Sequence, residues 1–599
     1  MIHKRVLGLL GIALGVSLLT LSADEPRSPI RALDKKLIEY GWDVPFPDFL
    51  RDHIREMERL PFDGIIFKLR SGCNVLTPKK FDPAKFAEEE AVLGQIAWGT
   101  FTDNFVILWA ASDQDWFSDE HWEAIAHNAR LLAHAARAAR CVGVCFDQEP
   151  YGTNPWSYAK AKHKDTKSFA EYEAIVRRRG AQFMRAIESE FPGLTVLTFF
   201  QLSYFSDLLR PMDPARRAAD LATKEYALMP AFLNGMLDAA GPGVAIIDGN
   251  EGAYYYSDSR AHFEVYHRIA QRGRLLVDPA LWPKYHNQVQ VGQALYIDQY
   301  FGLRTRKVLG HYMTPEERPK WFEHNVYWAM YTADKYVWCY SERMNWWTNK
   351  DVPPGCEDAI RAARAKLAEG KPLGFDLKPI VEKAQERQRA ETASRMKTRS
   401  AEIARLPADA KPAIDGRLDD AAWQGVKPLE SFVALASHPP DLKAQTQAWV
   451  AYDNAALYVA VRCQEPKPAN MRPGGANHDD SGIWEGDDVE LMIAAPGKTL
   501  PFYHFMVNPK GLAWDAVHTP EADLGYSPTW ERAAAVGADA WTAEIAIPWT
   551  ALNMPPPQPG AALRANLCRQ RTQDGELSAW SPMADGFLEH EAFGTWTFR

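Results

Sequence analysis

Eight short apolar runs, separated by stretches with helical spacing of apolar residues, place the strongest constraint on how this chain can fold. Most of the runs are continuously apolar, as strands buried on both faces of a sheet are. Eight strand–helix units between residues 36 and 347 predict a (β/α)8 TIM-like barrel. An open doubly wound sheet is the alternative, but no glycine-rich dinucleotide loop follows any run. The runs lie at 37–42, 64–69, 104–110, 142–147, 194–200, 244–248, 293–298 and 336–342.

The composition and the hydrophobic pattern of the sequence change twice after the barrel region. Residues 357–411 are charged and poor in large apolar side chains, which predicts a solvated, charged helical linker. From residue 412 to 599, short alternating segments separated by turn residues predict an all-β sandwich. The basic start, apolar run and small residues of 1–23 predict a secretory signal peptide. The α/β barrel, over 30–356, is the expected catalytic domain.

Composition and charge narrow the class of partner. The formal net charge of −9 leaves no basic excess for nucleic-acid phosphates, and no membrane span follows the signal peptide. The 21 Trp, 22 Tyr and 27 Phe suit sugar-stacking surfaces. The seven Cys and 16 His show no paired or zincin spacing, so we expect no metal and no cofactor. The segment 478–488, HDDSGIWEGDD, is acidic enough to suggest calcium, but it is more typical of a turn-rich β connection.

Six landmarks follow one another in the C-terminal region. They are IDGRLDDAAWQ (414–424), YDNAALYVAV (452–461), WEGDDVELMI (484–493), FMVNPKG (505–511), WTAEIAIPW (541–549) and FGTWTF (593–598). In this order they resemble the family 9 carbohydrate-binding modules over essentially the whole domain. Members of that family sandwich a terminal sugar between two aromatic side chains and bind its hydroxyls with polar groups. The resemblance implies Trp484 and Trp580 as the sandwiching pair and Glu490 as a hydroxyl-binding carboxylate.

In a (β/α)8 barrel the active site lies at the carboxyl ends of the strands, so the residues there form the candidate site. Several carboxylates at one mouth repel each other unless they share a chemical role or a metal. Glycoside hydrolysis supplies such a role, because one carboxyl group protonates the leaving oxygen while another attacks the anomeric carbon or activates water. The candidate substrate-binding residues are Asp43, Lys68, Trp109, Gln201, Asp248, Tyr254 and Trp346.

The segment VGVCFDQEPYG (142–152) ends a buried strand with two carboxylates. Side chains alternate along a strand, so Asp147 and Glu149 point the same way. The segment is similar to the D-x-E of family 18 glycoside hydrolases and to the N-E-P of the large retaining barrel clan. We therefore expect Glu149 to be the general acid, with Asp147 tuning its proton affinity. For the second carboxylate, Glu342 is slightly favoured over Glu251.

These features predict a secreted or periplasmic glycoside hydrolase. Its barrel would cleave O-glycosidic bonds of a polysaccharide or oligosaccharide by paired-carboxylate acid/base chemistry, and its sandwich would hold it on the substrate. The alternative is a non-catalytic glycan-binding protein with a degenerate barrel. A polysaccharide lyase is a third candidate, but the many mouth carboxylates count against it.

Overall fold

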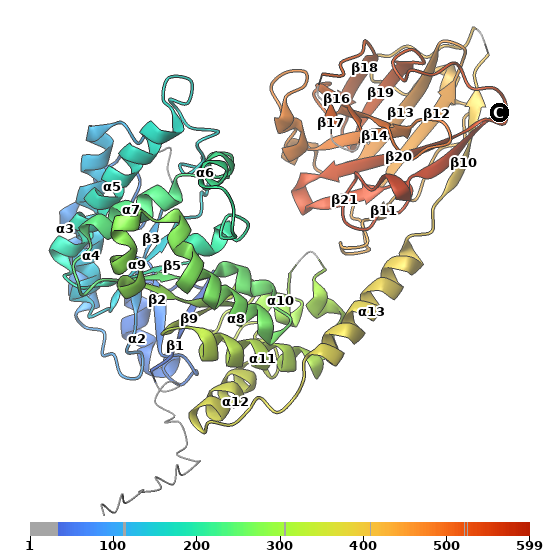
Figure 1. The fold of residues 1–599 in the computed structure, drawn as a ribbon. Coiled ribbons are helices and arrows are strands. Elements are labelled where there is room, and N and C mark those ends of the chain that lie inside the picture. Colours follow the sequence, from blue (N-terminus) through green and yellow to red (C-terminus); the bar gives the residue numbers. More distant parts are fainter. Residues whose placement is uncertain (1–33, 112–114, 305–306, 408, 520–521, 524) are drawn as a thin grey trace, which may run out of the picture.

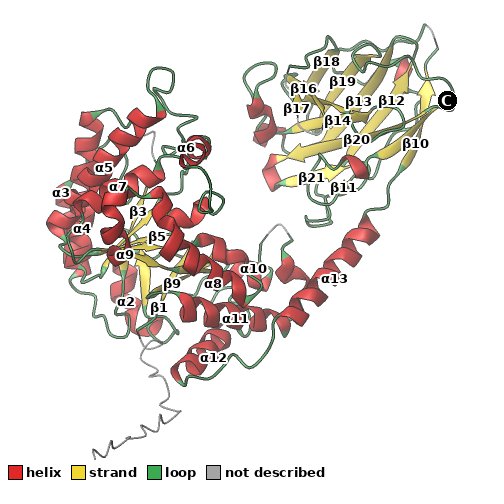
Figure 2. Cartoon of the chain, in the orientation of Figure 1, coloured by secondary structure: helices red, strands yellow, loops and turns green. Residues whose placement is uncertain are grey.

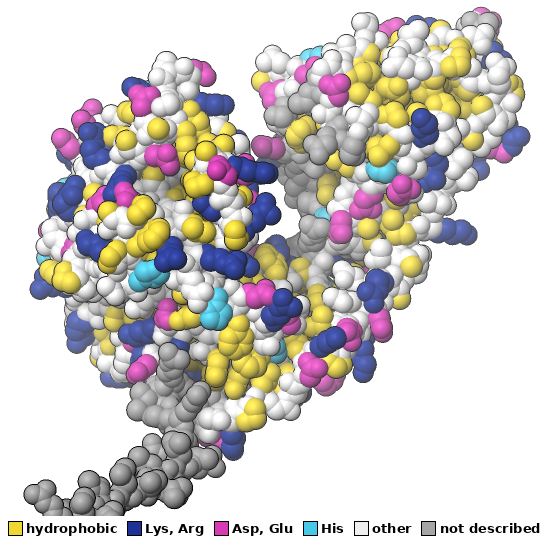
Figure 3. All heavy atoms as spheres, viewed as in Figure 1, with side chains coloured by type: hydrophobic (Ala, Val, Ile, Leu, Met, Phe, Trp, Pro, Cys, Tyr) yellow, Lys and Arg dark blue, Asp and Glu magenta, His cyan; other side chains and the backbone are white. Residues whose placement is uncertain are grey.

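The structure is a computed structural model that describes residues 34–111, 115–304, 307–407, 409–519, 522–523 and 525–599. The signal peptide predicted at 1–23 lies outside the described residues. Within the described part of the chain, no helix is both long enough and apolar enough to span a bilayer. Charged side chains of both signs are spread over both domains on the face drawn in Figure 3.

The N-terminal domain is a parallel barrel, which confirms the predicted fold (Figures 1 and 2). Its strands hydrogen-bond in the order β7-β6-β5-β4-β3-β2-β1-β9-β8, and every pair is parallel. The strands are β1 (Lys36–Gly41), β2 (Gly64–Phe67), β3 (Phe105–Trp109), β4 (Gly143–Asp147), β5 (Thr195–Thr198), β6 (Ala245–Asp248), β7 (Val289–Val291), β8 (Gln293–Tyr296) and β9 (Tyr336–Ser341).

The seventh strand of the barrel is divided in two at Gly292. Its first half, β7, pairs with β6, and its second half, β8, pairs with β9, so together they close the ring. The Gly292 N–H donates to the Asp248 carbonyl at 2.8 Å. A Cβ at Gly292 would lie only 3.0 Å from both Gly249 Cα and Ile247 Cγ2, so the division depends on the missing side chain.

Helices surround the parallel sheet (Figure 2). Several of them begin at side-chain caps: for example, Ser118 accepts from the His121 N–H, and Ser168 forms a capping box with Glu171. The helices are α2 (Pro47–Met57), α3 (Pro83–Leu93), α4 (Asp119–Ala138), α5 (Phe169–Glu190), α6 (Pro214–Ala222), α7 (Met229–Ala239), α8 (Ser259–His267), α9 (Trp282–Gln288), α10 (Ile297–Phe301), α11 (Glu317–Thr332) and α12 (Cys356–Ala368).

The segment predicted as a charged linker, 357–411, is more structured than its composition indicates. Most of α12 lies in it, and Ile360 and Ala363 of α12 are buried in the barrel core. Helix α13 (Lys378–Arg395) then runs from the barrel toward the second domain (Figure 1). The segment ends with β10 (Ser400–Arg405), which is a strand of the C-terminal sheet. A few apolar residues at helical spacing suffice to dock a helix whose other faces are charged.

The C-terminal domain is a β-sandwich, as predicted. Its strands pair in the order β17-β16-β15-β14-β20-β22-β10-β12-β13-β19-β18, and β10 joins the two layers by pairing in parallel with both β22 and β12. The remaining strands are β11 (Val433–Ala434), β12 (Thr446–Tyr452), β13 (Ala456–Gln464), β14 (Asp488–Ala494), β15 (Phe502–Val507), β16 (Ala513–His518), β17 (Ala522–Asp523), β18 (Glu531–Val536), β19 (Ala540–Pro548), β20 (Ala562–Arg571), β21 (Glu576–Ala579) and β22 (Gly594–Phe598).

Candidate active site and carbohydrate-binding face

A cavity of about 240 Å³ opens at the carboxyl ends of the barrel strands. Three glutamates line it: Glu149 two residues after β4, Glu251 three residues after β6, and Glu342 directly after β9. The structure therefore brings together three of the four predicted catalytic carboxylates. The other lining residues are Tyr40, Trp42, Tyr151, Phe199, Tyr254, Tyr255, Tyr296, Arg304, Trp338 and Tyr340.

Asp147 lies beneath Glu149 and is fully buried at the end of β4. Its Oδ1 accepts from the Glu149 N–H at 2.9 Å. The Tyr151 hydroxyl lies 2.5 Å from Glu149 Oε2 and 3.2 Å from Asp147 Oδ2. Burial, and then the charge of Glu149, raise the pKa of Asp147 well above its usual range. The Asp147 carboxyl therefore binds a proton more readily than an exposed aspartate does.

The single hydroxyl hydrogen of Tyr151 decides which carboxyl group, Asp147 or Glu149, it donates to. A hydroxyl has one hydrogen, so Tyr151 can donate to only one carboxyl group. The shorter contact is to Glu149, which identifies Glu149 as the acceptor. The Tyr151 hydroxyl therefore holds one carboxylate oxygen of Glu149 in place.

Glu251 is the carboxyl group at the mouth whose proton affinity is raised into the neutral range. Burial, followed by the negative charge of Glu149, raises the pKa of Glu251 to about 8. At pH 7 the folded protein therefore holds Glu251 mainly as the neutral acid. A group with this pKa can release a proton to a leaving oxygen near neutral pH, which is what a general acid requires.

Glu342 sits among different partners on the β8 and β9 side of the cavity. Its Oε1 accepts from the Tyr296 hydroxyl at 2.7 Å, and its backbone N–H donates to Asp298 Oδ2 at 2.9 Å. The Arg304 guanidinium lies 5.4 Å from the centre of the Tyr296 ring. Glu342 therefore shares its part of the cavity with a cation, whereas Glu251 faces the negative charge of Glu149.

The aromatic lining was only partly found from the sequence. Tyr254 was predicted, and it packs 5.8 Å from Tyr340 with nearly parallel rings. Trp338 stacks on Phe199 at 4.2 Å on the floor of the cavity. The sequence could have identified Trp338 and Tyr340 through the alternation of side chains along β9. Both residues share a face of the strand with Glu342, since the three are every second residue.

Three predicted substrate-binding residues near β1, β2 and β9 are not among the residues lining the cavity. The Asp43 carboxylate accepts from the Trp346 N–H at 2.9 Å and ties the loop after β1 to the loop after β9. Burial raises the pKa of Asp43 to about 6. Trp346 is buried and packs edge-on against Phe62, and Lys68 lies 4.8 Å from the centre of the Phe46 ring. In the structure Asp43 and Trp346 fix loops at the strand ends, and contact of these three residues with substrate stays a prediction.

Three further candidates also stand behind the lining residues. Asp248 is fully buried and accepts from the Gln201 and Ser203 N–H groups at 3.1 and 2.8 Å, which fixes the turns after β5 and β6. The Gln201 side chain is itself buried. The Trp109 ring packs edge-on against Tyr151 at 6.4 Å. These three residues lie behind the residues that line the cavity, and their contact with substrate stays a prediction.

In the sandwich, Trp484 and Glu490 lie beside the outer face of β14–β16. Trp484 is 46 % exposed and packs edge-on against Trp514 at 5.2 Å. Glu490 Oε2 lies 2.8 Å from His504 Nε2, and the His504 ring lies 5.1 Å from Trp514. The exposed indole beside a polar, aromatic patch is a surface on which a sugar ring can stack.

The predicted pairing of Trp484 with Trp580 is wrong. Trp580 is only 4 % exposed and belongs to the hydrophobic core between the two layers. Its ring fills the space beside Gly594, where a Cβ would lie 2.4 Å from it. Trp580 follows β21, and its indole points into the sandwich, so it cannot stack on a ligand that contacts Trp484. Trp514, which the sequence pattern did not single out, is the aromatic neighbour of Trp484.

Residues 414–598 match the family model described as "Carbohydrate family 9 binding domain-like". This match confirms the resemblance inferred from the sequence landmarks, and it covers less than half of the chain. A search of curated proteins returned no match. The C-terminal domain is thus a family 9-like carbohydrate-binding domain.

Solved structures similar to the chain fall into two groups. For the sandwich, a family 9 carbohydrate-binding module from Caldicellulosiruptor kristjanssonii in complex with glucose matches at 14 % identity (34 % of this chain and 96 % of that chain, TM-score 0.24). For the barrel, a GH5-4 broad-specificity endoglucanase from Clostridum cellulovorans matches at 12 % identity (56 % and 96 % coverage, TM-score 0.32). A GH18 chitinase from Pseudoalteromonas aurantia matches at 11 % identity (55 % and 100 % coverage, TM-score 0.29). The family match over 414–598 supports a carbohydrate-active protein.

Proposed function

We propose that this chain is a secreted glycoside hydrolase that cleaves O-glycosidic bonds of a polysaccharide or oligosaccharide at the mouth of its barrel. The observation that carries the proposal is the pair of unlike carboxyl groups in one aromatic cavity. Glu251 has a pKa raised to about 8, and Glu149 accepts a hydrogen bond from Tyr151. Glycoside hydrolysis needs one protonated and one ionised carboxyl group on either side of the scissile bond.

In this proposal Glu251 is the general acid and Glu149 is the nucleophile or general base. These roles differ from the sequence-based expectation, in which Glu149 was the acid. The exchange follows from the surroundings, because Glu251 is buried next to a negative charge and Glu149 is hydrogen-bonded as an acceptor. Glu342, held by Tyr296, accepts hydrogen bonds from sugar hydroxyls. The stacked rings of the cavity contact the apolar faces of the sugar.

The sandwich acts as a tether in the same proposal. Trp484 stacks on a sugar of the same substrate and Glu490 binds its hydroxyls, which raises the local concentration of glycosidic bonds at the barrel. The tether need not change the chemistry of the cavity. Removing Trp484 should therefore weaken activity on an insoluble glycan more than activity on a small soluble substrate.

The decisive experiment compares two leaving groups. After a polysaccharide panel has identified a substrate, Glu251→Gln should lower kcat/KM on the natural glycan by about 10²–10⁴-fold, because Gln cannot supply a proton. A nitrophenyl glycoside needs little protonation and should lose far less. Glu149→Gln should instead lose activity on both substrates. Glu88→Gln, an exposed change on α3, is the matched control and should leave both rates unchanged.

Two results would contradict the proposal. If Glu149→Gln shows the leaving-group dependence and Glu251→Gln does not, the acid is Glu149, as the sequence pattern alone indicates. If the wild-type chain binds glycans but releases no reducing ends from any of them, the barrel is a non-catalytic glycan-binding domain.

A further inference from the structure

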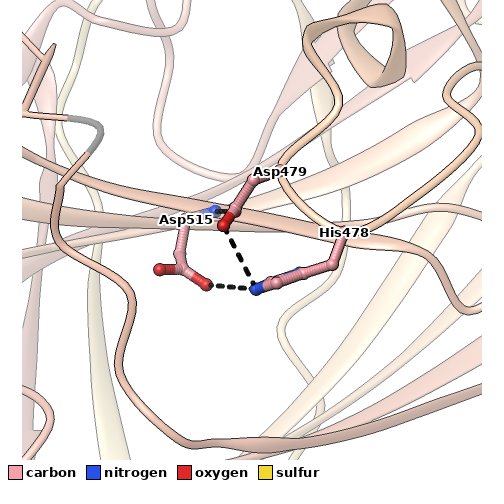
Figure 4. A group of neighbouring side chains, drawn as sticks. All are labelled: His478, Asp479 and Asp515. Atoms are coloured by element: carbon pink, nitrogen blue, oxygen red, sulfur yellow. Dashed lines mark hydrogen bonds and ion pairs between the residues drawn. The ribbon is translucent and has the colours of Figure 1, made fainter.

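A cluster of one imidazole and two carboxylates lies at the edge of the sandwich, away from the barrel cavity (Figure 4). His478 and Asp479 come from the segment before the 481–485 turn, and Asp515 comes from β16. One ligand atom from each residue lies within 4.8 Å of the others. Asp515 and Trp514 are successive strand residues, so the cluster is on the opposite face of β16 from Trp514.

The orientation of the His478 ring is fixed from outside the cluster. Its Nδ1 lies 2.8 Å from the Ala513 carbonyl oxygen, an acceptor, so Nδ1 carries a hydrogen. In the neutral ring the lone pair is then on Nε2. That nitrogen lies 3.5 Å from an oxygen of Asp479 and 3.5 Å from an oxygen of Asp515. A backbone carbonyl that orients a histidine in this way is the usual outer partner of a metal-binding imidazole.

These spacings suit a tetrahedral ion. Metal–nitrogen and metal–oxygen bonds of about 2.0–2.2 Å put neighbouring ligands roughly 3.4 Å apart. The two distances of 3.5 Å from Nε2 are therefore close to the edges of such a tetrahedron. Figure 4 shows both carboxylates directed at the same ring nitrogen.

Asp515 supplies an independent reason for a cation. It is 1 % exposed. Its Oδ2, the oxygen that lies 3.5 Å from His478 Nε2, also accepts from Trp530 Nε1 at 2.8 Å, and its Oδ1 has no hydrogen-bond partner among the described residues. A buried carboxylate with an unpartnered oxygen is costly unless a positive charge neutralises it.

We propose that His478, Asp479 and Asp515 bind one divalent transition-metal ion, with Zn²⁺ the best-fitting species. An imidazole nitrogen with two carboxylates suits Zn²⁺, whereas Ca²⁺ and Mg²⁺ prefer all-oxygen sets with more ligands. Three protein ligands leave a fourth position for water. The ion would tie the 478–479 segment to β16, and the turn that carries Trp484 begins two residues later. This site does not depend on the proposed hydrolysis.

The test is a Zn²⁺ titration of the full, tag-free chain after chelator treatment, followed by calorimetry. We expect one Zn²⁺ per chain, and we expect His478→Gln to weaken binding by more than about 10-fold. Zn²⁺ should also raise the melting temperature of the sandwich in the wild type and not in His478→Gln. Asp479→Asn, a partly exposed change, serves as the second ligand variant in case the buried Asp515→Asn fails to fold.

His134 provides a matched control. It also contacts two carboxylates, but through different nitrogens: Nε2 is 3.6 Å from Glu90 and Nδ1 is 3.2 Å from Glu190. Its carboxylates therefore cannot converge on one ion through a single nitrogen, and His134→Gln should keep wild-type Zn²⁺ binding. The proposal is overturned if wild-type protein binds no Zn²⁺, or if His478→Gln and Asp479→Asn bind it as tightly as the wild type does. The three side chains would then interact only with one another, without a metal ion.

Discussion

The raised pKa of Glu251 can be tested through stability, without knowing the substrate. Glu251→Gln keeps the shape of the side chain and stays neutral at every pH. In the wild type the pKa of this carboxyl rises from about 4.3 in the unfolded chain to about 8 in the folded one. Between these values the native state binds more protons than the unfolded state does. The free energy of unfolding therefore falls as pH rises through this window.

The magnitude follows from the size of the shift. At pH 5, less than one unit above the unfolded pKa, the penalty for keeping Glu251 neutral is about 1 kcal/mol. At pH 7 the penalty is about 3–4 kcal/mol, at 1.36 kcal/mol for each pH unit above the unfolded pKa. The Gln variant does not carry this penalty. Its stability advantage over the wild type should therefore grow by about 2–3 kcal/mol between pH 5 and pH 7.

Scanning calorimetry of the barrel transition at pH 5, 6, 7 and 8 measures this difference. For a domain of this size, 1 kcal/mol shifts the melting temperature by about 2 °C, so the gap should widen by about 5 °C between pH 5 and 7. Glu88→Gln on α3 is the control, and its gap should stay constant because the carboxylate is in water. A constant gap for Glu251→Gln as well would mean that Glu251 is ionised in the folded protein. The assignment of Glu251 as the acid would then be refuted.

Two further predictions use the same structure. Trp484→Ala should weaken sugar binding by roughly 1–3 kcal/mol with little change in the melting temperature. Trp580→Ala should instead lower the stability of the sandwich by about 3–5 kcal/mol, because it empties part of the core. Equal stability losses in the two variants would contradict this. Tyr151→Phe removes the hydroxyl that donates to Glu149 Oε2 and should lower kcat/KM by about 10-fold. An unchanged kcat/KM would show that the hydroxyl does not position Glu149.

Local sequence determines which carboxylates meet at the mouth of the barrel. Continuous apolar runs identify parallel strands buried on both faces, and parallel strands bring their carboxyl ends to one side. Glu149, Glu251 and Glu342 each follow such a run, so their presence in one cavity needed no knowledge of packing. The landmarks of the sandwich were likewise readable in order along the chain, and the family match over 414–598 confirms that resemblance.

Only the tertiary structure decided what each group near a strand end does. Asp43 and Asp248 look like mouth carboxylates in the sequence, but they accept backbone N–H groups from loops far away in the chain. Trp580 looks like a surface aromatic and lies in the core. Burial and charge at Glu251 depend on atoms brought by several strands. The proton affinity, exposure and ligand geometry of a side chain depend on residues that are close in space but distant in sequence. The spacing of residues along one strand therefore does not predict them.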